Sequence, residues 1–134
     1  MAIEQYLESY YSLYKGVTNE ILIISNIKLM GASNIIFSIK NKHSDPDSKS
    51  ILRIESLNGL VIMNGSQYPI STNGEIVTLD ESTGSIRIIL SSNASGQIIP
   101  SQKRLYDIKV KIGNEVKLIS HGKIDLLPDV TNFI

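Results

Sequence analysis

Leu105-Tyr-Asp-Ile-Lys-Val-Lys-Ile112 is a stretch in which apolar and polar side chains alternate from Tyr106 to Ile112. Turn residues follow at Gly113-Asn-Glu115, and a second segment then returns as Val116-Lys-Leu-Ile-Ser-His-Gly-Lys-Ile-Asp-Leu-Leu-Pro-Asp-Val-Thr131. Strict alternation places every second side chain on one face of a strand. The stretch therefore predicts a β-hairpin over residues 105–131.

The length of the hairpin loop decides which side chains face each other. A two-residue loop, Gly113-Asn114, would put Lys117 opposite Val110 on the apolar face. A loop of three or five residues puts Leu118 opposite Val110 instead, so we expect an odd loop.

The same register makes three further predictions. Tyr106 lies opposite Gly122, where an aromatic ring covers the exposed backbone of a strand glycine. Asp107 lies opposite His121 on the outer face, as a surface ion pair. The register also gives a small basic outer face, formed by Lys109, Lys111 and Lys117.

The rest of the chain consists of short apolar segments separated by turn residues about every 8 to 12 positions. Residues 3–14 carry tyrosines at helical spacing, but their second half also alternates, so we expect a short arm or helix followed by a strand. The apolar run Ile21-Leu-Ile-Ile24 predicts a buried strand within residues 20–27. Further strands are predicted within residues 34–40, 50–57, 60–63, 68–70, 75–79 and 85–91.

Polar segments connect these strands. Residues 41–50 are expected to form an exposed loop, and Asn58-Gly59 predicts a tight hairpin turn, because both residues tolerate positive φ. Residues 92–104 predict a long connection, which suits a sandwich better than a meander. We therefore expect an all-β fold, one antiparallel β-sandwich of about seven to nine short strands.

The 134 residues suit one domain, 1–134, with an N-terminal arm at 1–9, the sandwich at 10–131 and a C-terminal tail at 132–134. Cysteine is absent, which excludes disulfides and thiolate metal sites. Thirteen basic and thirteen acidic residues cancel, which argues against nucleic acid as a partner. No leader pattern and no apolar run of about 20 residues is present, so neither a signal peptide nor a membrane span is expected.

Candidate catalytic and metal-binding groups are sparse. Asp107 and His121 would need a nucleophile beside the imidazole, and no nucleophile motif accompanies them. Asp45 and Asp47 lack the further spaced ligands of a calcium loop, and His43 adds only one nitrogen ligand. We therefore expect no catalytic residues, no metal site, no cofactor and no enzymatic activity.

Tyrosines and the apolar C-terminus are the candidate interface. Tyrosine joins a large apolar area to a polar tip, which suits protein interfaces. The alternative is that two of the tyrosines simply cover the edge of the sandwich. The candidate residues are Tyr6, Tyr10, Tyr11, Tyr14, Val130, Phe133 and Ile134.

Four segments give the chain a resemblance to a known family. In order, they are Tyr14-Lys-Gly-Val-Thr18, Gly84-Ser-Ile-Arg-Ile-Ile-Leu90, Tyr106-Asp-Ile-Lys-Val110 and Gly122-Lys-Ile-Asp-Leu-Leu-Pro-Asp-Val-Thr131. The chain resembles the virion β-sandwich domains of tailed bacteriophages, typified by the N-terminal domain of baseplate upper proteins. Val17 replaces the family's aspartate, and residues 64–80 resemble an insertion.

The resemblance implies an immunoglobulin-like sandwich without catalytic residues. It implies a structural protein of the virion, assembled in the host cytoplasm, that acts as an assembly or adaptor module of the tail, baseplate or neck and carries fibres or receptor-binding proteins. Its partners would be other virion proteins and copies of itself, with no nucleic acid and no membrane. The alternatives are a receptor-binding module for host glycans and a capsid decoration protein; aromatic residues around a concave loop region would favour the glycan.

Overall fold

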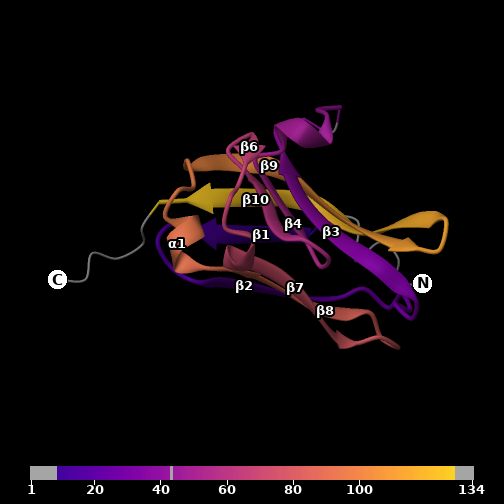
Figure 1. The fold of residues 1–134 in the computed structure, drawn as a ribbon. Helices are drawn as coiled ribbons and strands as arrows, with labels where there is room; N and C mark the ends of the chain where they lie inside the picture. Colours follow the sequence, from indigo (N-terminus) through magenta and orange to yellow (C-terminus); the bar gives the residue numbers. More distant parts are fainter. Residues whose placement is uncertain (1–8, 43, 129–134) are drawn as a thin grey trace.

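The computed structural model of the chain describes residues 9–42 and 44–128. Within these ranges ten strands form two sheets that pack face to face (Figure 1). The larger sheet has the order β1-β10-β9-β3-β4-β5-β6, and the smaller has the order β2-β8-β7. This confirms the predicted all-β sandwich, with slightly more strands than expected because β6 is a two-residue strand. The pairing is not antiparallel throughout, because β1 runs parallel to β10.

The strands are β1 Ser9–Tyr14, β2 Asn19–Ile24, β3 Ala32–Lys40, β4 Leu52–Glu55, β5 Gly59–Met63, β6 Ser66–Gln67, β7 Gly74–Asp80, β8 Ser85–Leu90, β9 Ser101–Ile112 and β10 Glu115–Leu127. The helical segments are the short 3-10 turns η2 Asp47–Lys49 and η3 Ser71–Asn73 and the one-turn helix α1 Ser92–Ser95.

The core lies between the inner faces of the two sheets. Strand β3 contributes Ile35, Phe37 and Ile39, all almost fully buried, as its alternation predicted. From the smaller sheet, β8 contributes Ile86, Ile88 and Leu90. Each such side chain stabilises the fold by roughly 1.5–3 kcal/mol through its burial.

Strand β2 differs from its prediction as a buried strand. Ile21 and Ile23 are buried, whereas Leu22 and Ile24 are 60% and 63% exposed. The apolar run therefore occupies both faces of β2, which is an edge strand of the smaller sheet. One face of the strand packs on the core, and the other face points away from the sandwich.

The β9–β10 hairpin has the two-residue loop Gly113-Asn114, so the prediction of an odd loop is wrong. Ile112 pairs with Glu115 in the ladder, and Gly113 takes a φ of 59°, a left-handed conformation that suits glycine. Val110 consequently faces Lys117, the pairing that the alternation argued against.

A β-bulge at Ile119 restores the expected register further from the turn. The ladder shifts between Leu118 and Ser120, and both Ile119 and Ser120 are buried opposite Ile108. Beyond this bulge, His121 faces Asp107 and Gly122 faces Tyr106, as predicted. The turn residues thus set the register at the tip of the hairpin. The extra residue of the bulge then shifts the register by one, so that the apolar side chains beyond it face the core.

The bulge also changes the predicted basic face. Lys109 and Lys111 lie opposite Leu118 and Val116, whereas Lys117 shares the face of Val110. The outer face at the tip therefore combines two lysines with two exposed apolar side chains, and Lys117 does not belong to it.

Three connections differ in detail from the sequence prediction. In the β4–β5 hairpin Glu55 pairs with Gly59, so the loop comprises residues 56–58, and only Gly59 takes a positive φ. No strand forms over residues 68–70, because β6 ends at Gln67. The connection 92–104 is shorter than expected, since it contains α1 and β9 already begins at Ser101.

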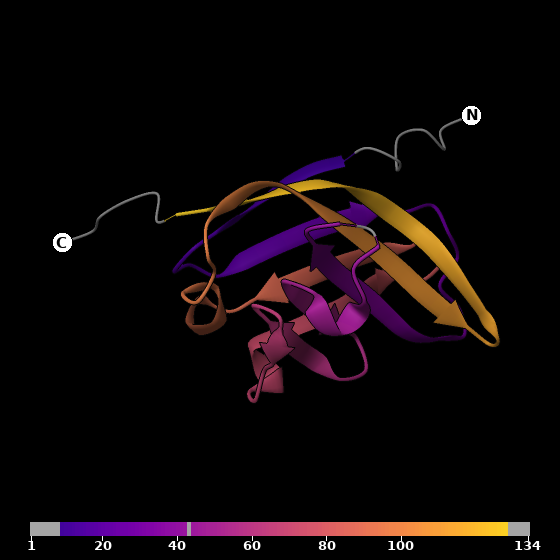
Figure 2. The same cartoon turned by 90° about the horizontal axis from the view of Figure 1, so that it is seen from above.

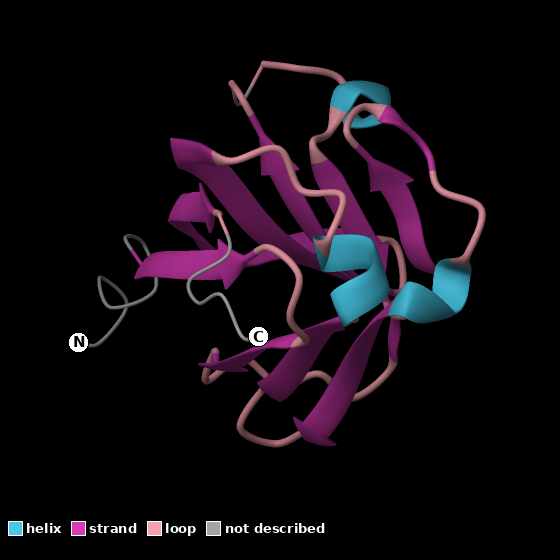
Figure 3. Cartoon of the chain, turned by 90° about the vertical axis from the view of Figure 1, so that its left-hand side faces the viewer, coloured by secondary structure: helices cyan, strands magenta, loops and turns pink. Residues whose placement is uncertain are grey.

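The ends of the sandwich are closed differently. At one end α1 lies where the chain crosses from β8 to β9, and the turn of the β9–β10 hairpin lies at the other end (Figures 1 and 2). Figure 3 looks onto the α1 end and shows α1 beside η3. Ser91 N donates to Asn73 O at 2.8 Å, which joins these two segments.

Candidate functional site

Asp107 and His121 lie in a row that crosses the outer face of the larger sheet. Ser38 of β3 pairs with Asp107 of β9, which pairs with His121 of β10. Within the described chain, no hydrogen bond or ion pair joins Asp107 to His121, so the predicted surface ion pair is not formed. The aspartate separates the serine from the imidazole by two strand spacings, roughly 9–10 Å, whereas a nucleophilic serine needs the imidazole beside it.

Asp47 belongs to a network of charges, which leaves it unsuited to binding a metal. It reaches from η2 to Lys40 Nζ at 2.7 Å and to Arg53 Nη1 at 3.2 Å. Arg53 Nε in turn binds Glu55 Oε2 at 2.8 Å. The hydrogen bond from Lys40, opposed by partial burial and helped by nearby cations, lowers the pKa of Asp47.

The other loop side chains considered as metal ligands are equally unsuited. Asp45 Oδ2 accepts from its own loop at Lys42 N, at 3.2 Å. His43 lies outside the described residues. Among residues 9–42 and 44–128, no three histidine, aspartate or glutamate side chains lie close enough together to hold a metal ion.

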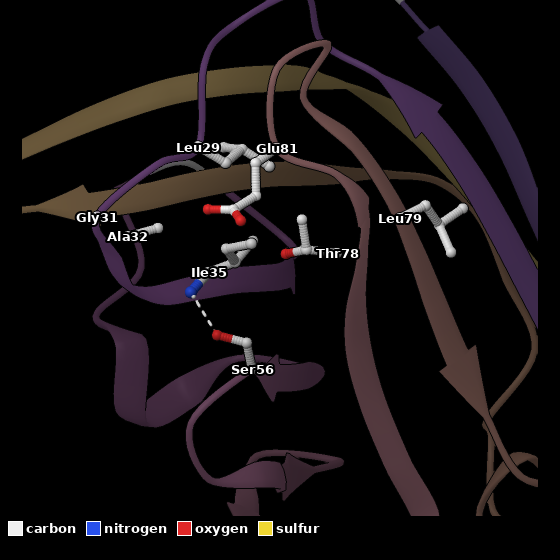
Figure 4. A pocket seen from close by; sticks show the side chains of 8 residues that line it. All are labelled: Leu29, Gly31, Ala32, Ile35, Ser56, Thr78, Leu79 and Glu81. Carbon is white, nitrogen blue, oxygen red and sulfur yellow. Dashed lines mark hydrogen bonds between the residues drawn. The ribbon is translucent and has the colours of Figure 1, made fainter.

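A cavity of about 280 Å³ lies between β3, the end of β7 and the segment before β3 (Figure 4). Leu29 and Ile35 form part of its wall, and the Thr78 and Glu81 side chains point into it. Ser56 Oγ accepts from Ile35 N at 2.8 Å and is therefore engaged in the fold. One carboxylate and the Thr78 hydroxyl do not make an acid-base pair, and we assign this cavity no chemistry.

A larger cavity of about 590 Å³, here called the Arg104 pocket, lies between the 41–50 loop, the β5–β6 turn and the start of β9. It is lined by Asn41, Lys42, Asp45, Lys49, Ile51, Asn64, Gly65, Ile99, Ser101 and Arg104. No aromatic side chain lines either cavity, so the feature expected of a glycan-binding site is missing from both. Sequence reasoning missed Arg104 because it lies in a segment interpreted as a connection.

Of the candidate interface residues, the structure describes three tyrosines on β1. Tyr11 turns inward and packs edge-on against Tyr106, with ring centroids 5.4 Å apart. Tyr10 is 54% exposed and donates to Asp125 Oδ1 at 2.8 Å, which raises the pKa of Tyr10. Tyr14 is exposed as well. The remaining candidates lie outside the described residues: Tyr6, Val130, Phe133 and Ile134.

The outer face of β2, β8 and β7 is a surface that sequence reasoning missed. It carries the exposed side chains of Leu22, Ile24, Val77 and Leu79 around Arg87. Ile21-Leu-Ile-Ile24 is continuously apolar, so no alternation in the sequence marks Leu22 and Ile24 as outward-facing. This surface is called the small-sheet face below.

Comparisons with known proteins support the fold alone. No family model and no curated protein matches the chain. Among solved structures, a crystal structure of a chicken TCR is similar with a TM-score of 0.52 and 13% identity, covering 94% of this chain and 56% of that chain. Another similar structure is Tim-2, with a TM-score of 0.48, 10% identity, and coverage of 94% of this chain and 97% of that chain.

The sandwich is therefore immunoglobulin-like, as expected. The comparisons say nothing about phage structural proteins. Over the described residues, no helix has the length and apolar character needed to cross a membrane.

Proposed function

We propose that this chain is a non-enzymatic structural protein of a tailed-phage virion, an assembly module of the tail, baseplate or neck. The observation that carries the proposal is the small-sheet face, where exposed apolar side chains gather on one side of the sandwich. Solvent-exposed apolar patches of this kind mark docking surfaces in soluble proteins. The sequence resemblance to virion sandwiches supplies the setting.

The small-sheet face suits a second copy of the same chain. Arg87 lies between Leu22 and Val77 in the ladder, and two carboxylates, Glu20 and Glu75, flank Ile89 at one end of the same face. A surface that carries both signs of charge among apolar side chains can pair with itself across a two-fold axis. Glu20 approaches Arg87 Nε at 3.5 Å within one chain, and because both side chains are exposed, Arg87 remains accessible to a carboxylate of a second copy.

A second exposed surface lies on the other sheet. Tyr10 and Tyr14 are exposed on β1, at the edge of the larger sheet. With docking surfaces on both sheets, one module can contact a copy of itself and a different neighbour at the same time. That is the requirement for an adaptor that carries fibres or receptor-binding proteins.

The non-enzymatic part of the proposal is supported by the order of side chains on the outer face. Asp107 stands between Ser38 and His121, so these three residues do not form a relay from serine to imidazole to carboxylate. Hydrolysis of a polysaccharide by the isolated protein, abolished by His121→Ala, would contradict this part.

Self-association tests the small-sheet face. Light scattering after size-exclusion chromatography should give a dimer for the wild type and a monomer for the double variant Leu22→Lys/Ile24→Lys. The matched control is Val116→Lys/Leu118→Lys, which changes two comparably exposed apolar residues on the hairpin tip and should remain dimeric. A wild type that stays monomeric at high concentration would contradict docking between copies.

The position in the virion needs a separate measurement. Mass spectrometry of purified particles, separated into heads and tails, should find the chain in the tail fraction. Recovery in the head fraction would favour the capsid decoration alternative, and absence from particles would overturn the virion assignment.

A further inference from the structure

Arg104 occupies an unusual position for a cation. In the β9–β10 ladder it faces Ile124, which is fully buried, and by strand alternation it shares the inward side with Tyr106 and Ile108. It therefore lies on the core side of the larger sheet, near the start of β9, where the Arg104 pocket opens.

The hydrogen bonds of Arg104 are incompletely satisfied by the described protein atoms. Nη1 donates to Asn41 Oδ1 at 2.8 Å, whereas the buried Nε has no acceptor within the described chain. A guanidinium carries five N–H donors in a fixed fork, and a buried donor without an acceptor is costly. The pocket thus contains a buried donor that an incoming oxygen atom could satisfy.

The surrounding charges favour an anion. Lys42 and Lys49 line the same pocket, and among the described residues the one carboxylate in the lining is Asp45, so the described lining carries a formal charge of +2. Asp45 is held by the backbone amide of Lys42 and does not pair with Arg104. The half-buried Ile51 adds an apolar patch to the wall, whereas Ile99 lies exposed at the rim.

We propose that the Arg104 pocket binds a small anionic ligand through a carboxylate or phosphate group. The guanidinium fork matches the planar geometry of a carboxylate and the oxygens of a phosphate, and both form short charge-assisted hydrogen bonds with arginine. The volume of about 590 Å³ falls within the range of small-molecule sites. This binding is separate from the assembly role, because no residue of the small-sheet face lines the pocket.

NMR titration of the full chain with inorganic phosphate, citrate and glucuronate tests the proposal. We expect saturable shifts in the amide signals of the pocket. Arg104→Gln should bind at least about tenfold more weakly than the wild type, because one charge-assisted contact is lost. Arg87→Gln removes a comparable arginine from the small-sheet face and should leave the affinity unchanged. A response to phosphate alone identifies a phosphate-bearing ligand, and a response to citrate or glucuronate identifies a carboxylate-bearing one.

A second variant guards against misfolding of Arg104→Gln. Lys42→Gln/Lys49→Gln changes two exposed lysines of the 41–50 loop and should weaken the same binding without altering the fold. The proposal is overturned if none of the three anions gives saturable shifts at the pocket, or if Arg87→Gln weakens binding as much as Arg104→Gln does.

Discussion

Tyr106 packs the β9–β10 hairpin against two neighbouring strands and also joins the two strands of the hairpin to each other. Its ring packs against Tyr11 of β1 and lies 6.1 Å from the ring of Phe37 in β3. Its hydroxyl and Ser120 Oγ are 2.9 Å apart in a buried hydrogen bond. Ser120 is placed there by the bulge at Ile119, so this hydrogen bond depends on the register shift.

Tyr106→Phe should therefore destabilise the protein by about 1–2 kcal/mol, because it removes a buried hydrogen bond and leaves the Ser120 hydroxyl without this partner. Urea unfolding at neutral pH measures the change. The double variant Tyr106→Phe/Ser120→Ala should lose less than the sum of the two single variants, because each single change breaks the same contact. Strictly additive losses would show that the hydroxyl pair contributes nothing.

Among the elements, the β4–β5 hairpin depends on a glycine that is tightly enclosed. Gly59 has a φ of 73°, and an added Cβ would meet the carbonyl group of Ser71 and come within 3.1 Å of Gly74 O. Gly65 has a similar φ of 78°, but an added Cβ there would have open space. An alanine at Gly65 therefore reports the cost of the left-handed backbone alone, and an alanine at Gly59 reports that cost together with the cost of steric overlap.

We expect Gly65→Ala to cost about 1–2 kcal/mol from the left-handed conformation alone. Gly59→Ala should cost about 2–5 kcal/mol, because the chain must also move away from η3. Thermal and urea unfolding of both variants provide the comparison. Equal losses would indicate that the β4–β5 loop and η3 yield freely to the extra atom.

Side-chain alternation predicted the elements well where one face is buried. It identified β3, β8, and the far part of the β9–β10 hairpin, because the buried face leaves only one acceptable register. It failed near the hairpin tip, where Val116 and Leu118 are exposed and the register is set by Gly113-Asn114. A bulge is one residue of backbone irregularity, and the alternation of side chains did not reveal it.

The surfaces were harder to predict than the strands. Ile21 and Leu22 look alike in sequence, but one faces the core and the other faces out, because β2 lies on the outside of a two-layer fold. The role of Arg104 depends on Asn41, which is distant in sequence, and Asp47 meets Lys40 and Arg53 on the two strands that flank its loop. Such contacts follow from the fold and not from local pattern.

Across the whole molecule, a chain of charges ties the 41–50 loop to the larger sheet. It runs from Lys40 through Asp47 and Arg53 to Glu55, crossing from β3 to η2 and β4. Burial raises the pKa of Glu55, but hydrogen bonds from Arg53, Asn58 and Asn34 outweigh it and hold the pKa below its usual 4.5. The hydrogen bond from Lys40 similarly holds the pKa of Asp47 below its usual 3.8.

These two pKa values make stability depend on pH in a definite direction. A carboxyl whose pKa is lowered by folding binds fewer protons in the folded state than in the unfolded state, so its stabilisation is present above the unfolded pKa. That stabilisation is lost as the pH falls through the folded pKa.

The free energy of unfolding should therefore decrease as the pH falls below about 4.5. The double variant Asp47→Asn/Glu55→Gln should be less stable than the wild type at pH 7, but its free energy of unfolding should change less with pH below about 4.5. Urea unfolding from pH 7 to pH 3 at constant ionic strength measures both slopes. If the double variant lost stability with acid as steeply as the wild type, other carboxyl groups would have to govern acid unfolding.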